Sequence, residues 1–366
     1  MTTERGMAMA LALARRGLGR TGTNPSVGCV IMRDGRVLGR GRTARGGRPH
    51  AETQALAHAE RRFGAGATRG ATAFVTLEPC AHHGWTPPCA TAMIGAGIAR
   101  VVAPFPDPDP RVAGKGFAML REAGIEVVIG PGERPARALL ASYLRMRATG
   151  RPTVTLKLAT TLDGRIATRS GESQWITGAE ARRRTHLLRA QSDAILVGVG
   201  TVLADDPALD VRLPGMGETG PAPIIADRAL RTPPDARLLA HGKALIVGDA
   251  AGQPKCAAAL RAAGASIAQA APDSDIGDLL GLAVQHGHGA IFCEGGATLA
   301  AALIREDCVD RLVWFTAGAV LGADGRGAID ALGIDHLADA PRFRQVSLET
   351  IGPDTLGIWT RDKEIA

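Results

Sequence analysis

Three residues in the first quarter of the chain are of types that bind zinc, and a carboxylate lies beside one of them. His50 is followed two positions later by Glu52, and Cys80 and Cys89 stand on either side of an eight-residue segment. One imidazole and two thiolates fill three positions of a tetrahedral zinc and leave the fourth for water, as in a catalytic site. Glu52 is then placed to move the proton of that water. The pattern predicts a zinc-dependent deaminase of a nucleobase-like ring, with Glu52 as the catalytic residue.

Each of these residues has a simpler explanation when it is taken alone. His50 would ordinarily be a surface or core histidine, and the two cysteines would suit a structural zinc site or core packing. The combination favours a catalytic zinc. The other four cysteines lie in apolar runs, where we expect buried or chemically neutral side chains: Cys29, Cys256, Cys293 and Cys308.

The segments around the ligand set alternate between helix and strand. Asp34-Gly35, between two apolar runs, indicates a hairpin turn, and Pro88 indicates the first turn of a helix. Both halves of the ligand set then lie at strand-to-helix junctions, where a helix N-terminus favours thiolate over thiol. The order predicts a three-layer αβα sandwich with helices on both faces of the sheet. We expect helices at residues 3–18, from 50, from 88, from 115 and at 133–147, and strands at 27–32, 36–41, 73–77, 99–103 and 126–129.

The length of the chain favours two domains. Its 366 residues are too many for one ordinary core, and Thr149-Gly150-Arg151-Pro152 breaks a helical pattern. We therefore expect a front domain at residues 1–147 and a back domain at 151–366. No apolar run approaches the roughly 20 residues of a membrane span, and the N-terminus lacks a secretory pattern. These features predict a cytoplasmic protein without a membrane segment.

The positive charge of the chain is concentrated at the front. Residues 1–150 carry 21 Lys and Arg against 10 Asp and Glu, whereas residues 151–366 carry 22 against 26. A basic front half suits an anionic small molecule and would also suit nucleic acid. Aromatic residues make up only 3% of the chain, which leaves little material for stacking exposed bases and counts mildly against nucleic acid.

The distance between the two cysteines narrows the expected substrate further. Nucleic-acid deaminases usually carry a short P-C-x-x-C motif, whereas the metal loop of this chain, residues 80–89, reads C-A-H-H-G-W-T-P-P-C. With N-P-S-V-G at 24–28 and D-P-D-P-R-V-A-G-K-G at 107–116, the front domain resembles the deaminase domain of the bifunctional riboflavin-biosynthesis deaminase/reductases. The resemblance implies a cytidine-deaminase-like fold, a hydrogen bond from Asn24 to the pyrimidine edge, and a substrate contact from His82. Taken alone, Asn24 is better explained as a turn residue before a proline.

Two positions depart from the pattern of that family. Arg42 stands where the family usually has histidine, and Trp85 stands where it often has lysine or arginine, near the expected substrate phosphate. We expect Arg42, Arg45 or Arg48 to supply the phosphate contact instead. The same arginines would also suit a solvated basic loop.

The back half resembles the reductase domain of the same family, which has a dihydrofolate-reductase-like α/β fold. The matching segments are 157–167, 170–177, 182–190, 198–209 and 294–299. The resemblance implies that NADPH is held by Ala159, Trp175, Thr201, Asp205, Gly295, Gly296, Ala297, Thr298 and Leu299. It also implies that the sugar-phosphate site is lined by Ser173, Arg189, Leu209, Arg212 and Glu294.

The residues around the double glycine also support a nucleotide site. An apolar strand at 290–293 runs into Glu294-Gly295-Gly296, and a helix is expected from Ala297 to about Ile304. The glycines let the backbone approach a ligand, and the helix N-terminus can hold a phosphate, although such turns are often purely structural. The motif is not G-x-G-x-x-G, so a Rossmann fold is not indicated.

Three arginines of the back half are candidates for phosphate contacts. Arg189 and Arg212 could each pair two phosphate oxygens, or could form surface ion pairs with Asp205 or Asp210. Arg228 follows an expected strand and could pair the 2′-phosphate that distinguishes NADPH from NADH.

Together the two resemblances imply a bifunctional enzyme that uses zinc and NADPH. The front domain would deaminate 2,5-diamino-6-(5-phosphoribosylamino)pyrimidin-4-one, and the back domain would reduce the ribosyl group to ribityl, with Glu294 or Lys157 assisting. Two alternatives stay open: a nucleic-acid base deaminase with an appended binding domain, and a deaminase of another phosphoribosyl pyrimidine. Reductase domains of this type commonly pair, so the resemblance also implies a homo-oligomer.

Overall fold

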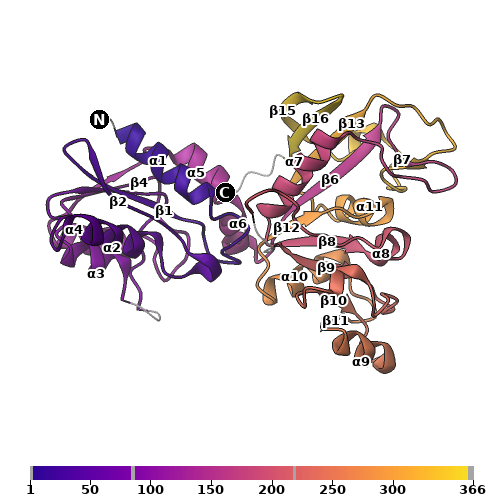
Figure 1. Cartoon of the computed structure of the whole chain (residues 1–366), viewed down its shortest axis with the longest axis horizontal. Helices are drawn as coiled ribbons and strands as arrows, with labels where there is room; N and C mark the ends of the chain where they lie inside the picture. Colours follow the sequence, from indigo (N-terminus) through magenta and orange to yellow (C-terminus); the bar gives the residue numbers. More distant parts are fainter. Residues whose placement is uncertain (1–2, 84–86, 217–219, 362–366) are drawn as a thin grey trace. The chain divides into compact units, whose positions relative to one another are not determined.

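The computed structural model describes residues 3–83, 87–216 and 220–361. The chain divides into two compact units, Met1–Gly150 and Arg151–Ala366, which are called here the front and back units (Figure 1). Among the residues described, no helix is both long enough and apolar enough to cross a membrane.

The front unit is built on a five-stranded sheet with the order β2-β1-β3-β4-β5. The strand β1 pairs antiparallel with both β2 and β3, whereas β3, β4 and β5 run parallel. The expected hairpin is present between β1 and β2, with Asp34 and Gly35 at φ 51° and 75°, the left-handed conformation that a two-residue hairpin turn requires. The strands are β1 Gly28–Arg33, β2 Arg36–Arg42, β3 Thr72–Val75, β4 Arg100–Ala103 and β5 Glu126–Ile129.

Helices cover both faces of this sheet, as the sequence predicts. The helices α1 and α5 lie on one face, and α2, α3 and α4 lie on the other (Figure 1). The helix expected at 133–147 is interrupted at Leu140, where the backbone leaves helical geometry and a second helix begins. The helices are α1 Thr3–Arg15, α2 Ala51–Phe63, α3 Cys89–Gly95, α4 Lys115–Glu122, α5 Glu133–Leu139 and α6 Ala141–Thr149, with a short 3-10 helix at Arg45–Gly47.

Glycines allow α2 to pack directly on β2. A Cβ atom added to Gly41 would lie 2.0 Å from the backbone oxygen of Ala51, and one added to Gly39 would lie 2.1 Å from that of Ala55. Real side chains do not approach backbone atoms so closely. The absence of side chains at these two positions therefore sets the position of α2, the helix that follows His50.

The back unit contains a nine-stranded sheet with the order β11-β10-β9-β8-β12-β6-β13-β16-β15. The seven strands from β11 to β13 are parallel, β16 pairs antiparallel with β13, and β15 pairs antiparallel with β16. A small second sheet pairs β7 with β14. The strands are β6 Thr153–Thr161, β7 Arg165–Ala167, β8 Ala194–Gly198, β9 Ala222–Ala226, β10 Leu245–Gly248, β11 Ser266–Gln269, β12 Ala290–Cys293, β13 Arg311–Ala317, β14 Arg326–Gly327, β15 Arg344–Ile351 and β16 Asp354–Thr360.

Alternate residues of these strands bury opposite faces of the sheet. On β8, Leu196 packs toward α10 and α11, whereas Ile195 and Val197 pack toward α8 and α9. The carboxyl ends of the parallel strands β6, β8 and β12 lie side by side, which is where open α/β sheets bind ligands. The helices are α7 Ala179–Ala190, α8 Val199–Asp205, α9 Pro254–Ala262, α10 Ile276–Gln285 and α11 Ala297–Arg305, with 3-10 helices at Arg237–Leu239 and Leu337–Asp339.

Gly41→Ala should destabilise the front unit by about 1–3 kcal/mol, the usual cost of overpacking a filled contact. Denaturant unfolding of the full chain measures this loss. Gly95→Ala in α3 is the matched control, because a Cβ there meets no atom within 4 Å. Equal stability of the two variants would show that α2 does not press on β2 at Gly41.

Candidate functional site

The three expected zinc ligands come together from three different elements. His50 is the residue before α2, Cys80 follows β3, and Cys89 is the first residue of α3, one position later than the helix start expected at Pro88. The Nδ1 of His50 lies 3.6 Å from the Sγ of Cys80 and 3.3 Å from the Sγ of Cys89. All three ligand atoms lie within 4.8 Å of one another.

This donor set fits zinc in both chemistry and spacing. Bond lengths of about 2.0 Å to nitrogen and 2.3 Å to sulfur place neighbouring ligand atoms of a tetrahedron roughly 3.5 Å apart. The separations of 3.3 and 3.6 Å around the His50 nitrogen match that distance. Zinc would therefore be held by His50, Cys80 and Cys89.

The two sulfur atoms cannot both be thiolates without a positive charge between them. Cys80 accepts a hydrogen bond from the backbone N–H of Cys89 at 3.3 Å. Hydrogen bonds from the Cys89 thiol and from His50 outweigh burial and lower the pKa of Cys80 to about 4. The same contact with Cys80, together with burial, raises the pKa of Cys89. A bound cation would allow the second thiolate to form.

Glu52 lies beside the ligands in the first turn of α2, and its side chain is buried. Burial raises the pKa of this carboxyl to about 7, with His50 opposing and Cys80 adding to the rise. A carboxyl group that titrates near neutral pH can both accept and return a proton. This is the behaviour that a deaminase needs of its proton carrier.

A second buried carboxylate, which the sequence analysis missed, fixes the backbone next to the metal loop. Glu78 accepts hydrogen bonds from the backbone N–H groups of Asp107, Gly114 and Phe117 at 2.9–3.1 Å. It thereby ties the segment 107–117 to the end of β3. An acidic residue between Leu77 and a proline was the only signal for this role.

The residues expected to contact the substrate of the front unit lie on loops. Asn24 is exposed, and its Nδ2 donates to the carbonyl of Thr21 at 3.3 Å, which is a turn contact. The Nδ1 of His82 is buried and has no hydrogen-bond partner among the described residues. Trp85 lies outside the described residues. Substrate contacts of Asn24 and His82 stay predictions.

Arg42 lies among other arginines. Its Nη1 donates to the backbone carbonyl of Arg16, and burial, with the charges of Arg20 and Arg16, lowers its pKa. The ion pairs found within the described ranges include none of these three side chains. Clustered positive charges of this kind attract an anion.

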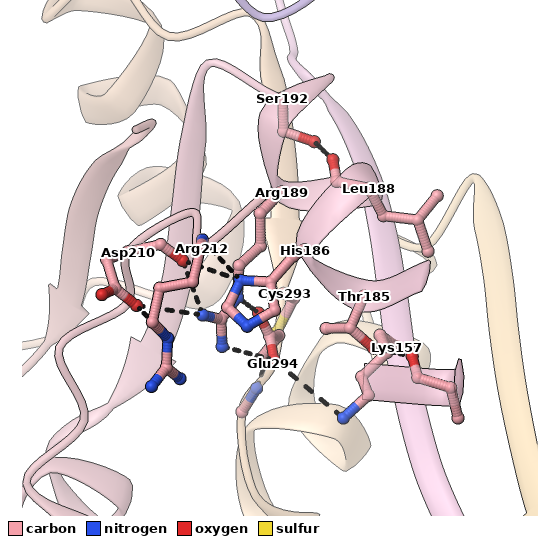
Figure 2. Close-up of polar contacts among 12 residues, drawn as sticks. Lys157, Thr185, His186, Leu188, Arg189, Ser192, Asp210, Arg212, Cys293 and Glu294 are labelled. Carbon is pink, nitrogen blue, oxygen red and sulfur yellow. Dashed lines mark hydrogen bonds and ion pairs between the residues drawn. The ribbon is translucent and has the colours of Figure 1, made fainter. Parts of the chain in front are cut away.

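The back unit holds a buried carboxylate at the carboxyl end of β12. Glu294 accepts hydrogen bonds from the Nε and Nη2 of Arg189 at 2.5 and 3.1 Å, and the Nζ of Lys157 lies 4.0 Å from it (Figure 2). Burial alone would raise the pKa of Glu294, but Arg189 and Lys157 hold it below its ordinary value. Burial lowers the pKa of Lys157. The partners expected for Arg189 were a phosphate, Asp205 or Asp210; the structure pairs it with Glu294 and places the carboxylate of Asp210 4.0 Å away.

Arg189 also reaches the loop that follows α8. Its Nη1 donates to the carbonyl of Asp210 at 2.8 Å, and the carboxylate of Asp210 lies 3.2 Å from the Nε of Arg212. Arg212 is largely exposed, so this ion pair is weak and its guanidinium remains accessible. Leu209 is buried in the same loop with φ at 50°.

The loop after β12 can accept a cofactor phosphate. Gly296 is the residue before α11, and no side chain caps this helix end, so its first backbone N–H groups can face a ligand. A Cβ added to Gly296 would lie 3.8 Å from the Oγ1 of Thr201 in α8. Two of the segments expected to hold the cofactor are therefore adjacent, at the ends of the neighbouring strands β8 and β12.

The remaining expected residues are spread over the back unit. Trp175 is 66% exposed, and the guanidinium carbon of Arg182 lies 4.6 Å from the centre of its ring. Ala159 lies on β6, Ser173 precedes α7, and Asp205 is the last residue of α8. Their contacts with substrate or NADPH stay predictions.

Arg228, the expected reader of the 2′-phosphate, is held by backbone carbonyls. Its Nη1 donates to the carbonyl of Pro272 at 2.6 Å, and its Nη2 donates to that of Ser274. To bind a 2′-phosphate, Arg228 would have to use the N–H groups that these two hydrogen bonds leave over. This role also stays a prediction.

Both parts of the chain match known families. Residues 152–356 match the family described as RibD C-terminal domain, and residues 1–104 match the cytidine and deoxycytidylate deaminase zinc-binding region.

Similarity to curated and solved proteins extends over nearly the whole chain. The riboflavin biosynthesis protein RibD of Escherichia coli strain K12 is 43% identical, over 97% of this chain and 98% of that protein. RibD of Aquifex aeolicus is 37% identical, over 97% of each. The structure of Acinetobacter baumannii RibD, form 1, aligns with a TM-score of 0.88 at 37% identity and covers 98% of this chain and 99% of that one.

Cys80→Ser should lower zinc affinity by more than about 100-fold. Losing a residue that only hydrogen-bonds to a metal ligand already costs about 10–100-fold, and losing a ligand itself should cost more. Zinc content during competition with a chelator measures this change. Cys256→Ser is the matched control, because Cys256 is exposed and lies outside the ligand set. Unchanged zinc affinity of Cys80→Ser would contradict the assignment.

Proposed function

The chain belongs to the RibD family of riboflavin-biosynthesis proteins, and on that premise we propose that its two units act in turn on one substrate. The front unit, with its deaminase domain at residues 1–147, hydrolytically deaminates 2,5-diamino-6-(5-phosphoribosylamino)pyrimidin-4-one. The back unit, residues 151–366, then reduces the ribosyl group of the product to ribityl with NADPH.

One observation carries the first half of this proposal. A nitrogen and two sulfurs converge at the distances of a zinc site, with the buried carboxyl of Glu52 beside them. Three protein ligands are the number found in catalytic zinc sites, whereas structural sites have four.

Glu52 is the proton carrier of the proposed deamination. Zinc, when bound, supplies Lewis acidity that lowers the pKa of a water to about 7. Glu52 would carry one proton of that water to the ring nitrogen and the other to the departing amine. The oxygen of the water bonds to the ring carbon, the carbon–nitrogen bond breaks, and ammonia leaves. A carboxyl with pKa about 7 suits both transfers.

The front unit also has the charge to hold the substrate phosphate. Arg42, with Arg16 and Arg20 nearby, takes the place of the basic residue expected at Trp85. We assign the pyrimidine edge to Asn24 and a further substrate contact to His82. The nitrogen of His82 that has no partner among residues 3–83, 87–216 and 220–361 can bond a polar ligand.

In the back unit we assign the sugar phosphate to Arg189 and Arg212, and the cofactor to the loop at Gly295 and Gly296. NADPH held by this loop would supply a hydride for the sugar C1′, the bond from C1′ to the ring oxygen would open, and that oxygen would take a proton. Glu294 and Lys157 are the buried titratable groups at this site. We also assign contacts with substrate or cofactor to Ser173, Leu209, Ala159, Trp175, Thr201, Asp205, Arg228, Ala297, Thr298 and Leu299.

The proposal favours a free pyrimidine over nucleic acid. The long metal loop and the acidic back unit argue against nucleic acid as substrate. We expect the protein to bind NADPH at all salt concentrations tested. Any affinity for RNA should disappear as the salt concentration rises. A homo-oligomeric state and a cytoplasmic location stay predictions.

Glu52→Gln should reduce deamination by about 10²–10⁴-fold while zinc content stays unchanged, because Glu52 carries protons and is not a ligand. Ammonia release measures the first step, and NADPH oxidation with supplied 5-amino-6-(5-phosphoribosylamino)uracil measures the second. The second rate is the internal control and should equal that of the wild type. Zinc-loaded Glu52→Gln that still deaminates at the wild-type rate would refute this role.

Arg42→Ala should raise the KM of deamination roughly tenfold, the scale of one lost hydrogen bond to a charged group, with a smaller change in kcat. Steady-state ammonia release measures both constants. Arg137→Ala is the control, because that arginine pairs with Glu133 on the surface of α5. An unchanged KM would remove Arg42 from the phosphate site.

A further inference from the structure

The loop of residues 207–212 has no helix or strand of its own, yet it carries two residues of the proposed sugar-phosphate site. Two side chains of α7, His186 and Arg189, hold this loop. The backbone N–H of Arg212 donates to the Nδ1 of His186 at 3.2 Å, and the Nη1 of Arg189 donates to the carbonyl of Asp210 at 2.8 Å (Figure 2). Residues three apart on a helix share a face, so both contacts come from one side of α7.

The Nδ1 of His186 meets two backbone groups of the loop, the N–H of Arg212 and the carbonyl of Asp210, each at 3.2 Å. With the ring proton on Nε2, Nδ1 accepts from Arg212, and with the proton on Nδ1 it donates to Asp210. Either neutral form of the ring ties His186 to the loop. The charged groups that face His186 are Arg189 on its own helix, Arg212 and Asp210 on the loop, and Glu294 after β12. Burial, with Arg189 and Arg212, lowers the pKa of His186 and favours the neutral ring.

We propose that His186 is a positioning residue of the reductase site, which fixes the backbone at Arg212 so that Arg212 can join Arg189 at one phosphate group. His186 itself need not touch the substrate. The inference rests on the proposed function, because it takes the phosphate of the phosphoribosyl substrate as the ligand of these arginines.

Two features of the contacts support a positioning role. Arg189 already uses its Nε and Nη2 on Glu294, so its orientation is fixed by β12. Arg212, in contrast, is exposed and has only the carboxylate of Asp210 beside its guanidinium in the described structure. The contact with His186 therefore fixes the backbone of Arg212, from which the less constrained of the two side chains extends. Losing it would leave Arg189 in place and release Arg212.

Two variants of the full-length chain test this role. His186→Leu removes the acceptor and keeps an apolar side chain on α7, whereas His186→Gln retains an oxygen that can accept from the N–H of Arg212. His286→Leu is the matched control, because His286 is exposed at the end of α10 and its side chain lies at hydrogen-bond distance from the carbonyl of Leu282 in its own helix. The measured quantities are the KM for the deaminated phosphoribosyl substrate, kcat, the KM for NADPH, and inhibition by ribose 5-phosphate. Ammonia release by the front unit reports that the chain is intact.

His186→Leu should raise the substrate KM and the inhibition constant of ribose 5-phosphate by about three- to tenfold, the scale of one hydrogen bond. The KM for NADPH and the rate of ammonia release should not change, and His186→Gln should recover most of the loss. A wild-type substrate KM in His186→Leu would overturn this inference and leave the proposed function standing. The same would follow if the KM for substrate and the KM for NADPH rose equally and His186→Gln recovered neither. A wild-type chain that does not reduce the substrate would overturn the proposed function and this inference with it.

Discussion

The front unit depends on bringing two cysteine sulfurs and one imidazole nitrogen within a few ångströms of one another. Such a cluster is costly without a cation, because ionising Cys80 raises the pKa of Cys89 beside it. The surrounding structure holds the cluster together from three sides. Gly41 lets α2 press on the sheet, Glu78 ties the segment 107–117 to the end of β3, and Cys89 begins α3. A metal that stabilises both thiolates then also stabilises the packing of these elements.

In the back unit, basic side chains balance the charge of a buried carboxylate. Glu294 is surrounded by Arg189 and Lys157, so the carboxylate stays ionised although it is removed from water. Both sites nevertheless follow the same structural rule, since each lies where strands end and helices begin. One fold class thus supports hydrolysis at one site and hydride transfer at the other, and the chemistry is set by the residues at the strand ends.

Features that depend on residues close together in the sequence were predicted correctly. Contacts between residues far apart in the sequence were missed. The Asp34-Gly35 hairpin, the order of helices and strands in the front unit, and both expected folds are confirmed. The break at Leu140 was missed because an Ala- and Leu-rich segment has helical propensity on both sides of it. The pairing of Arg189 with Glu294 joins residues 105 positions apart. No periodicity reports such a contact, because the packing of α7 on the sheet beside β12 brings the two residues together.

The central claim is that one chain holds two independent sites that act in sequence. The most direct measurement follows zinc-loaded protein and the diaminopyrimidine substrate, first without NADPH and then after its addition. We predict that ammonia is released and an unreduced phosphoribosylaminouracil accumulates in the first phase, and that NADPH then converts this product to the ribityl compound. Ammonia release that begins only when NADPH is added, or an accumulated uracil that is not reduced, would contradict the account.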